Sequence, residues 1–326
     1  MDFHDPLNAV LEIRRQLASE KRRLAFFFGA GTSMAVGIPG IDELTEKVSD
    51  KLSDFYKVNY EKVKSSLQGN AHVEMILNRI RLIRELLGDS EKYKYAGLSG
   101  TIVKELDSRI CKAISEIVCD IPQIETMPQL FFAQWLRELQ LKCDFPIEIF
   151  TTNYDLLFEH AFEKANVPFF DGFVGSVAPV FTPEAVEPEN IKVYPPQGWV
   201  RLWKIHGSIN WYFDKSKTGD IGRIVRLSGW ELKPGQELII FPSREKYIES
   251  RKLPFLTFQD RLRRFLNSGE CLLIIAGYSF SDEHLNEIIF QGLRSNPRLA
   301  VTVFHYGEKE SEGDLFILPE IGRASC

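Results

Sequence analysis

The stretch LAFFFGAGTSMAVGIPG, residues 24–40, decides how this chain is interpreted. Residues 24–28 form a continuous apolar run, which is typical of a strand buried on both faces of a parallel sheet. Glycines follow at once, and glycine allows the backbone to turn tightly and another group to come close to it. We therefore expect a buried strand followed either by a phosphate-binding loop or by a plain strand-to-loop turn.

Further apolar runs of strand length occur at 147–151, 200–205, 237–241, 271–276 and 299–304. They are continuous rather than alternating, which again favours strands of a buried parallel sheet. Helical patterns lie between several of them, at 156–166, 254–269 and 282–295. Strands that alternate with helices predict a doubly wound α/β fold.

Two intervals depart from this rhythm. Residues 42–145 are charged and helical in pattern, so we expect a helical insertion or subdomain within one domain that covers residues 1–326. Residues 169–199 are rich in proline and glycine and predict a loop or short strands. That second segment is either a substrate-covering segment or an irregular surface excursion.

The composition excludes several classes of protein. The net charge of −5 gives no electrostatic case for nucleic acid or anionic membranes. No apolar run approaches the roughly 20 residues of a spanning helix, and the N-terminus lacks an apolar signal core. We therefore expect a cytoplasmic protein. The five cysteines are scattered and never spaced as C-x-x-C, which predicts core positions rather than disulfides or a zinc site.

Polar clusters follow three of the predicted strands. TTNYD, residues 151–155, offers either a helix cap at Asn153 or several ligand-facing side chains at a sheet edge. His206, before Gly207, is a candidate general base or a structural histidine, and the aromatic residues 211–213 line a groove or fill the core. Asp282 is predicted to cap a helix.

In chain order, GAGTS (29–33), GIP (37–39), TTNYD (151–155), HG (206–207) and GYS (277–279) resemble the sirtuin-like family of NAD-consuming domains. The resemblance spans residues 20–305. It implies a Rossmann-like sheet with NAD, as substrate, at its carboxyl edge. With the large helical insertion, the pattern is most similar to that of bacterial anti-phage defence NADases.

The resemblance also implies roles for individual residues. The catalytic residues would be Asn153, Asp155 and His206. The residues around the phosphates and ribose would be Gly29, Ala30, Gly31, Thr32, Ser33, Gly37, Ile38 and Pro39. The adenosine-side contacts would be Gly277 and Ser279.

Departures from the family pattern shape the expected activity. Deacylases of this family carry two C-x-x-C pairs after the HG motif, and this chain has only Cys271 and Cys326 beyond His206, so we expect no zinc module and no metal. Gly40-Ile41-Asp42 stands where those deacylases have an aspartate-phenylalanine-arginine run. The expected activity is therefore NAD hydrolysis to nicotinamide and ADP-ribose or its cyclic form.

Such an enzyme would deplete NAD during infection and would need control. We expect activation through homo-oligomerisation or through a defence-system partner, such as an ATPase or a phage-sensing subunit. The alternatives are an NAD-dependent deacylase or ADP-ribosyltransferase, and a non-catalytic module that senses NAD or ADP-ribose.

Overall fold

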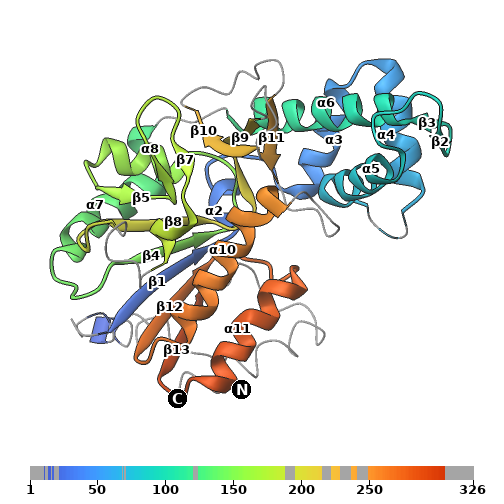
Figure 1. Cartoon of the computed structure of the whole chain (residues 1–326). Coiled ribbons are helices and arrows are strands. Elements are labelled where there is room, and N and C mark those ends of the chain that lie inside the picture. Colours follow the sequence, from blue (N-terminus) through green and yellow to red (C-terminus); the bar gives the residue numbers. More distant parts are fainter. Residues whose placement is uncertain are drawn as a thin grey trace.

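The computed structural model describes residues 22–67, 69, 71–119, 124–187, 195–214, 222–227, 236–240 and 249–304, with residues 11, 14, 15 and 17. At its centre is a parallel sheet of six strands. Their order is β13 (Leu299–Phe304), β12 (Cys271–Ala276), β1 (Arg23–Phe28), β4 (Glu148–Thr151), β8 (Val200–Lys204) and β5 (Phe169–Phe170). Figure 1 shows these strands side by side.

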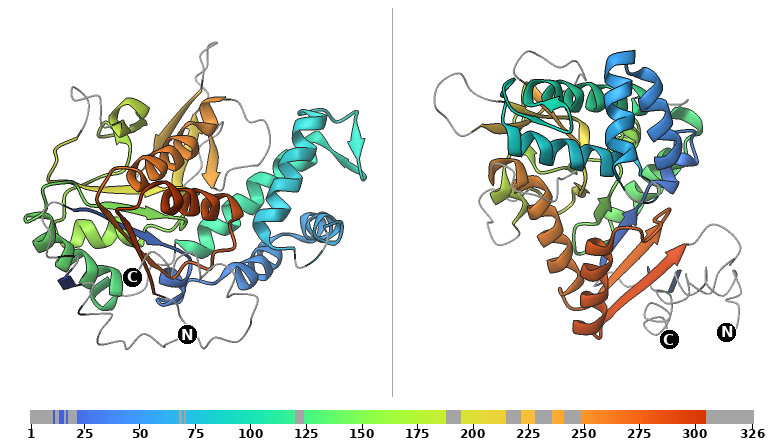
Figure 2. Two further views of the ribbon diagram at one scale, coloured as in Figure 1. Left: turned by 90° about the horizontal axis from the view of Figure 1, so that it is seen from below. Right: turned by 90° about the vertical axis from the view of Figure 1, so that its right-hand side faces the viewer.

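Helices cover both faces of this sheet (Figures 1 and 2). The core of one face joins Phe27 and Phe150 to α10 (Glu249–Leu266) and α11 (Glu283–Ser295). The core of the other face joins Phe26 to α7 (Pro128–Gln140) and α8 (Leu157–Lys164). Fully burying each such phenylalanine contributes about 1.5–3 kcal/mol. The predicted doubly wound, Rossmann-like α/β fold is confirmed.

The register brings the carboxyl ends of the strands together. Phe28, the last residue of β1, pairs with Thr151 of β4 and with Ala276 of β12, and Thr151 pairs with Lys204 of β8. The chain passes from β1 to β4 and β8 on one side and then returns to β12 on the other. Loops that leave strands at such a reversal of strand order form the ligand crevice of open α/β sheets.

A second sheet of five strands is antiparallel. Its order is β11 (Gln236–Ile240), β9 (Gly207–Asp214), β10 (Arg223–Arg226), β7 (Val180–Phe181) and β6 (Phe173–Val174). The prediction that residues 237–241 belong to the parallel sheet is therefore wrong: β11 pairs antiparallel with β9. A short apolar run fits either kind of sheet, and only its partner decides. Trp211, Tyr212 and Phe213 of β9 fill the core rather than line a groove.

Residues 169–187 contain β5, β6, β7 and a short helix α9 (Pro183–Val186), as expected for a segment of short strands. The rest of that segment up to residue 194 lies outside the described residues.

Four helices between β1 and β4 form a lobe beside the sheet (Figures 1 and 2). They are α3 (Ile41–Lys51), α4 (Asp54–Ser65), α5 (Val73–Leu87) and α6 (Gly100–Val118), with a hairpin of β2 (Lys94–Tyr95) and β3 (Leu98–Ser99). A short α2 (Gly31–Met34) precedes them, and a 3-10 turn η1 (Ile124–Thr126) follows before α7. The core of this lobe also contains Leu157 and Ile209, so the lobe packs directly against segments that leave β4 and β8.

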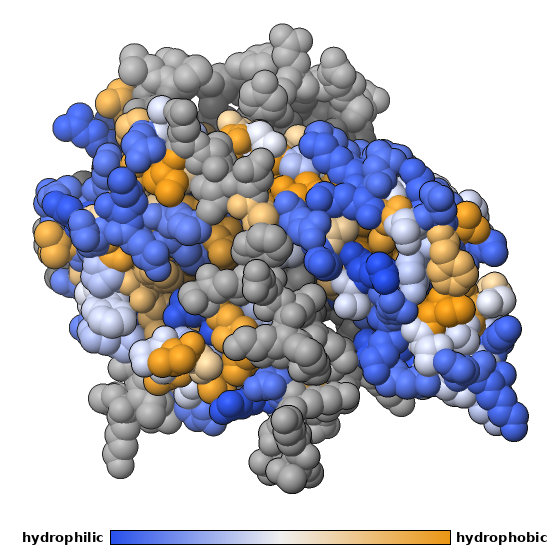
Figure 3. Space-filling model, turned by 90° about the horizontal axis from the view of Figure 1, so that it is seen from above, coloured by the Kyte–Doolittle hydropathy of each residue, from blue (hydrophilic) through white to orange (hydrophobic). Residues whose placement is uncertain are grey.

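The surface seen from above is mostly polar on the side of the helical lobe (Figure 3). The described helices of the lobe also carry large apolar side chains that are more than half exposed, among them Phe55 and Val58 of α4 and Leu86 of α5. Within the described ranges, no helix combines the length and the apolar character needed to cross a membrane.

Candidate functional site

The loop after β1 is held against the loop after β12. A Cβ at Gly29 would lie 2.5 Å from the carbonyl oxygen of Gly277, and one at Gly31 would lie 2.8 Å from Gly277 Cα. Gly31 N donates to that same carbonyl at 2.8 Å. Gly277 itself has φ of +64°, a conformation that favours glycine. The close approach that the glycines permit is therefore one between two backbone loops.

Asn153 connects β4 to this loop. Its Nδ2 lies 3.0 Å from the carbonyl oxygen of Gly29, 3.1 Å from Thr32 Oγ1 and 2.7 Å from Ser33 Oγ. The Gly29 carbonyl can only accept, which identifies the donating end of the amide. Asn153 Oδ1 has no partner among the described residues and is left to accept a hydrogen bond from a ligand or a water.

Asp155 also connects the segment after β4 to the loop after β1. Its Oδ2 accepts a hydrogen bond of 2.5 Å from Ser33 Oγ, and its Oδ1 accepts one of 3.0 Å from Leu157 N at the start of α8. Asp155, and not Asn153, thus accepts a hydrogen bond from a backbone N–H at the start of α8. Ser33 and Asp155 are both buried, each only 4% exposed. Losing one of these hydrogen bonds would therefore leave a buried polar atom that water cannot reach.

Lys204, at the end of β8, holds the segment that follows β4 in place. Its Nζ donates to the carbonyl oxygen of Asp155, to Glu159 Oε1 at 2.8 Å and to Ser208 Oγ at 2.8 Å. The lysine is 1% exposed, and a buried ammonium needs such a complete set of acceptors. A lysine at a strand end gives no signal of this role in the sequence.

His206 lies two residues beyond β8, where Gly207 has φ of +88°. Its Nε2 is 3.2 Å from Asp282 Oδ2, and Asp282 Oδ1 caps α11 by accepting from the N–H groups of His284 and Leu285. The predicted cap at Asp282 is confirmed. Burial alone would raise the pKa of Asp282, but the contact with His206 and the cap hydrogen bonds hold it below its usual value.

Glu74, in the first turn of α5, brings a second carboxylate toward this pair. It is half-buried. Desolvation raises its pKa to about 7; the charge of His206 acts to lower that pKa, and the charge of Asp282 acts to raise it. Burial likewise raises the pKa of Tyr154 well above its usual value, with smaller contributions from Glu74 and Asp155. The ionisation of Glu74 is therefore coupled to that of residues that follow β4 and β8.

The other residues predicted to contact NAD lie on the segments that follow β1 and β12. Ala30 and Ser279 are exposed, and Ser279 Oγ is 3.0 Å from Ser281 Oγ. Gly37 has φ of +91° and open space around it, and Pro39 is half-buried. The side chain of Ile38 packs into the core of the helical lobe.

The structure thus brings most of the predicted residues to one edge of the sheet. Direct hydrogen bonds join Gly29, Thr32, Ser33, Asn153 and Asp155. His206 reaches Asp282 instead, in a neighbouring group on the same edge. Sequence reasoning missed Glu74 and Lys204, because nothing in the chain around them distinguishes them from other charged residues.

No group of histidine, cysteine or carboxylate side chains suited to a metal occurs in the described part of the chain. Cys111 and Cys271 are buried free thiols, as predicted for core positions; Cys119 and Cys143 are half-buried. Cys326 lies outside the described residues.

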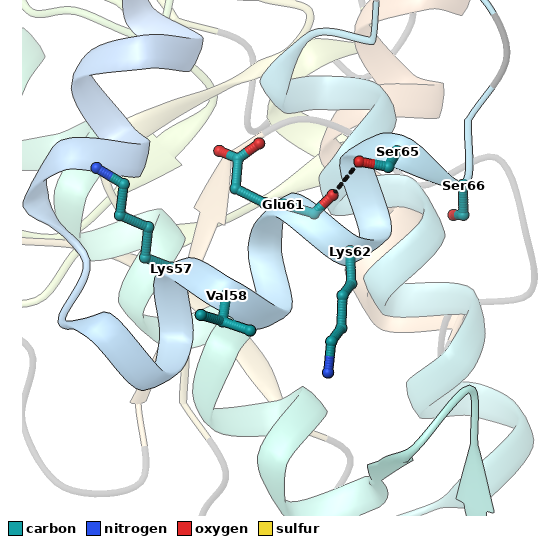
Figure 4. A pocket seen from close by; sticks show the side chains of 6 residues that line it. All are labelled: Lys57, Val58, Glu61, Lys62, Ser65 and Ser66. Atoms are coloured by element: carbon teal, nitrogen blue, oxygen red, sulfur yellow. Dashed lines mark hydrogen bonds between the residues drawn. The ribbon is translucent and has the colours of Figure 1, made fainter.

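A separate surface hollow lies over α4 (Figure 4). It is lined by Lys57, Val58, Glu61, Lys62, Ser65 and Ser66. Ser65 Oγ donates to the carbonyl of Glu61 there, at 2.7 Å. None of the predicted site residues lines this hollow, so we do not include it in the site.

Fold and site define a doubly wound α/β protein with a polar centre at the carboxyl edge of its sheet. A sequence profile described as SIR2-like domain matches residues 147–316, more than half of the chain. This chain belongs to the SIR2-like domain family. No curated protein sequence matches it.

The chain is also similar to several solved structures. One is a Sir2 homolog–NAD complex, with 14% identity, a TM-score of 0.47 and coverage of 99% of this chain and 94% of that chain. A mutant Sir2 homologue in complex with ADP-ribose has 13% identity and a TM-score of 0.43, covering 96% and 95%. Sir2 bound to an acetylated peptide has 13% identity and a TM-score of 0.41, covering 96% and 98%.

Proposed function

We propose that this chain cleaves NAD at the bond between nicotinamide and ribose, releasing nicotinamide and ADP-ribose or cyclic ADP-ribose. Membership of the SIR2-like family supports the use of NAD. The observation that carries the proposal is the arrangement of Asn153. Its Nδ2 is committed to the loop after β1, so its Oδ1 is the atom available to orient a water.

The residues at the sheet edge fit such a substrate. Ala30 and Ser279 are exposed on the two loops that meet at Gly29 and Gly277, where the phosphates and adenosine would lie. The absence of side chains at these glycines lets the two loops pack directly against each other there. The hydroxyl of Ser33 is already engaged by Asn153 and Asp155, so Ser33 would position those residues rather than reach the ligand through Oγ.

Cleavage of this bond passes through a transition state with oxocarbenium character, which needs positioning and electrostatic support more than a strong nucleophile. Asn153 would orient the attacking water. His206 would take a proton from that water or from a ribose hydroxyl, as a general base. Asp282 would keep the ring of His206 in place, since it contacts Nε2 from the start of α11.

We propose a role in bacterial anti-phage defence through NAD depletion, in the cytoplasm, on the basis of the family pattern and the helical lobe. Activation would come from homo-oligomerisation or from a partner protein that senses infection. Exposed apolar side chains on α4, Phe55 and Val58, offer a surface for such contacts. Mass photometry of the protein with and without NAD would test the first route: a monomer in both conditions and fully active would exclude control by self-association.

Two other functions deserve a direct test. A deacylase or ADP-ribosyltransferase would use the same centre but would transfer to an acyl-lysine or a protein. A sensing module would bind NAD or ADP-ribose without cleaving it. The second is less well supported, because binding alone does not require both Asn153 and His206 at one sheet edge.

The experiment is to incubate the purified chain with NAD, with and without an acetyl-lysine peptide, and to separate the products by chromatography. Asn153→Ala and His206→Ala are compared with control variants at similar residues away from the site, Asn267→Ala and His160→Ala. Peptide-independent release of nicotinamide that both site variants lose and both controls keep is the expected result. Release only with peptide would favour the deacylase, and binding without release the sensing module.

A further inference from the structure

The loop after β12, residues 277–282, contains a strained residue between two residues of the site. Phe280 has φ of +56°, in the left-handed region that a bulky side chain rarely occupies. It stands between Ser279, expected on the adenosine side, and Asp282, which contacts His206. A residue held in such a conformation costs about 1–3 kcal/mol and persists only where its surroundings fix it. The contacts that fix Phe280 therefore bear on the site.

Asn286, four residues after the N-cap of α11, supplies such contacts with both ends of its side chain. Its Nδ2 donates to the carbonyl oxygen of Phe280 at 2.6 Å, and its Oδ1 accepts from the hydroxyl of Tyr278 at 3.1 Å. The rings of Tyr278 and Phe280 pack against each other, with centroids 4.8 Å apart. Asn286 is 7% exposed, so water competes little for these hydrogen bonds. The amide thus holds the two aromatic residues of the loop together.

The start of the loop is fixed by a different contact. Gly31 N donates to the carbonyl oxygen of Gly277 at 2.8 Å, from the loop after β1. Loss of the Asn286 side chain leaves that contact unchanged. The residues that it frees lie further along the loop, toward Asp282. The consequence falls on His206, because Asp282 Oδ2 lies 3.2 Å from its Nε2.

We propose that Asn286 is a positioning residue of the site: it holds the strained loop in the form that places Asp282 against His206. The pKa of Asp282 lies below its usual value, so its carboxylate is ionised and can only accept. His206 therefore carries a proton on Nε2, which fixes one tautomer and one orientation of the ring. Asn286 acts on the reaction through this pair. Its effect on turnover rests on the proposed cleavage of NAD, whereas its effect on the His206 ring does not.

The test follows the His206 ring and NAD turnover in one set of variants. Protein that carries ¹⁵N-labelled histidine reports the tautomer of His206 through the chemical shifts of its ring nitrogens, and the signal is assigned by its loss in His206→Ala. Steady-state kinetics gives kcat and KM for NAD. The variants are Asn286→Ala, the milder Tyr278→Phe, which removes one hydroxyl, and Asn286→Ala combined with Phe280→Gly.

Asn296→Ala is the matched control. Asn296 is also 7% exposed and lies at the other end of α11, where its Nδ2 donates to the backbone carbonyls of Leu266 and Gly269, each at 2.8 Å. Its removal should lower the free energy of unfolding about as much as that of Asn286, since both lose buried hydrogen bonds. It should leave kcat and the ring of His206 unchanged. An effect that follows from instability alone would appear in both variants.

Asn286→Ala should lower kcat by about tenfold or more, with KM within about threefold of the full chain, because it impairs the general base and not the nucleotide side. The ring of His206 should show mixed tautomers. Tyr278→Phe should change kcat and the ring signal in the same direction and less. Because glycine adopts a positive φ without strain, adding Phe280→Gly to Asn286→Ala should restore much of kcat and the single tautomer.

Three results would overturn the inference: an unchanged His206 signal in Asn286→Ala, equal effects in Asn296→Ala, or no recovery on adding Phe280→Gly. If Asn286→Ala fails to fold, Tyr278→Phe decides by the same signal. If the full chain does not cleave NAD, hydrolysis is wrong as the function, while the His206 signal still decides the role of Asn286.

Discussion

Ser33 Oγ donates a hydrogen bond of 2.5 Å to Asp155 Oδ2, although 122 residues separate the two in the chain. The helical lobe occupies most of that interval. The bond therefore closes the long excursion between β1 and β4 at the point where both strands end. Asn153 reinforces it by donating to the same serine hydroxyl. The lobe can be large because its two ends are fixed to each other at the centre of the site.

Replacing Asp155 by alanine should loosen this closure. The change leaves Ser33 Oγ and Leu157 N without their buried acceptor, which should cost about 2–4 kcal/mol of unfolding free energy. Urea denaturation measures this loss. NAD cleavage should fall as well, because Asn153 loses its fixed position. Asp144→Ala, at an exposed aspartate, is the control and should change neither quantity; equal losses in both variants would contradict the assigned role.

Gly29→Ala should destabilise the protein through a clash between backbones. The new Cβ would lie 2.5 Å from the Gly277 carbonyl oxygen and 2.6 Å from Tyr278 Cα, so the two loops must separate. Overpacking of this kind costs roughly 1–3 kcal/mol. Thermal unfolding should show a lowered midpoint. At Gly198 a Cβ meets nothing within 4 Å, so Gly198→Ala is the control. It should change the unfolding midpoint by no more than about a degree or two, or raise it slightly. An equal drop in both variants would show that the clash at Gly29 is not the cause.

The central sheet and the location of the site could be predicted because both follow from local features. A continuous apolar run such as 24–28 indicates a buried strand, and polar residues directly after it must lie at the carboxyl edge. The order of the motifs then indicated the family. Asp282 was predictable as a cap because capping depends on residues adjacent in the chain.

The antiparallel sheet and the role of Lys204 could not be predicted, because they depend on contacts between residues far apart in the chain. The antiparallel sheet is built from strands as short as two residues, and β11 shows no signal that separates it from a parallel strand. The lobe meets the sheet edge because its core includes Leu157 and Ile209. Lys204 looks like an ordinary end of a strand until Asp155, Glu159 and Ser208 are found around it.

Arg261→Met should be strongly destabilising. The guanidinium of Arg261, on α10, holds Glu148 of β4 through two hydrogen bonds, one of them 2.6 Å from Nε to Oε2. Trp203 Nε1 also donates to this carboxylate, at 2.8 Å. Both charged side chains are almost fully buried. Removing the arginine leaves a buried charge uncompensated, which should cost about 3–5 kcal/mol.

Two further variants test that explanation. Arg263→Met removes an exposed arginine of the same helix that pairs with Asp260, and should cost no more than about 1 kcal/mol. Combining Arg261→Met with Glu148→Gln removes the stranded charge and should recover part of the loss in urea denaturation. If the double variant is as unstable as the sum of the single ones, the cost lies in packing and not in charge.

Glu74→Gln should raise the stability of the protein at high pH. Desolvation raises the pKa of Glu74 to about 7, above its ordinary value of 4.5. Because the folded pKa exceeds the unfolded one, the favourable contribution is complete below pH 4.5 and is lost as the pH rises through 7. Above pH 7 the ionised carboxylate is a net cost to folding, and the neutral glutamine removes that cost.

The charged groups that act on the pKa of Glu74 are His206, between β8 and β9, and Asp282, before α11. With these left in place, Glu74→Gln should gain about 1–2 kcal/mol at pH 8 and nothing at pH 4.5, measured by urea denaturation at both values. Glu85→Gln should gain at neither pH. Equal gains at pH 8 and at pH 4.5 would contradict this explanation, because only the ionised carboxylate is costly to bury.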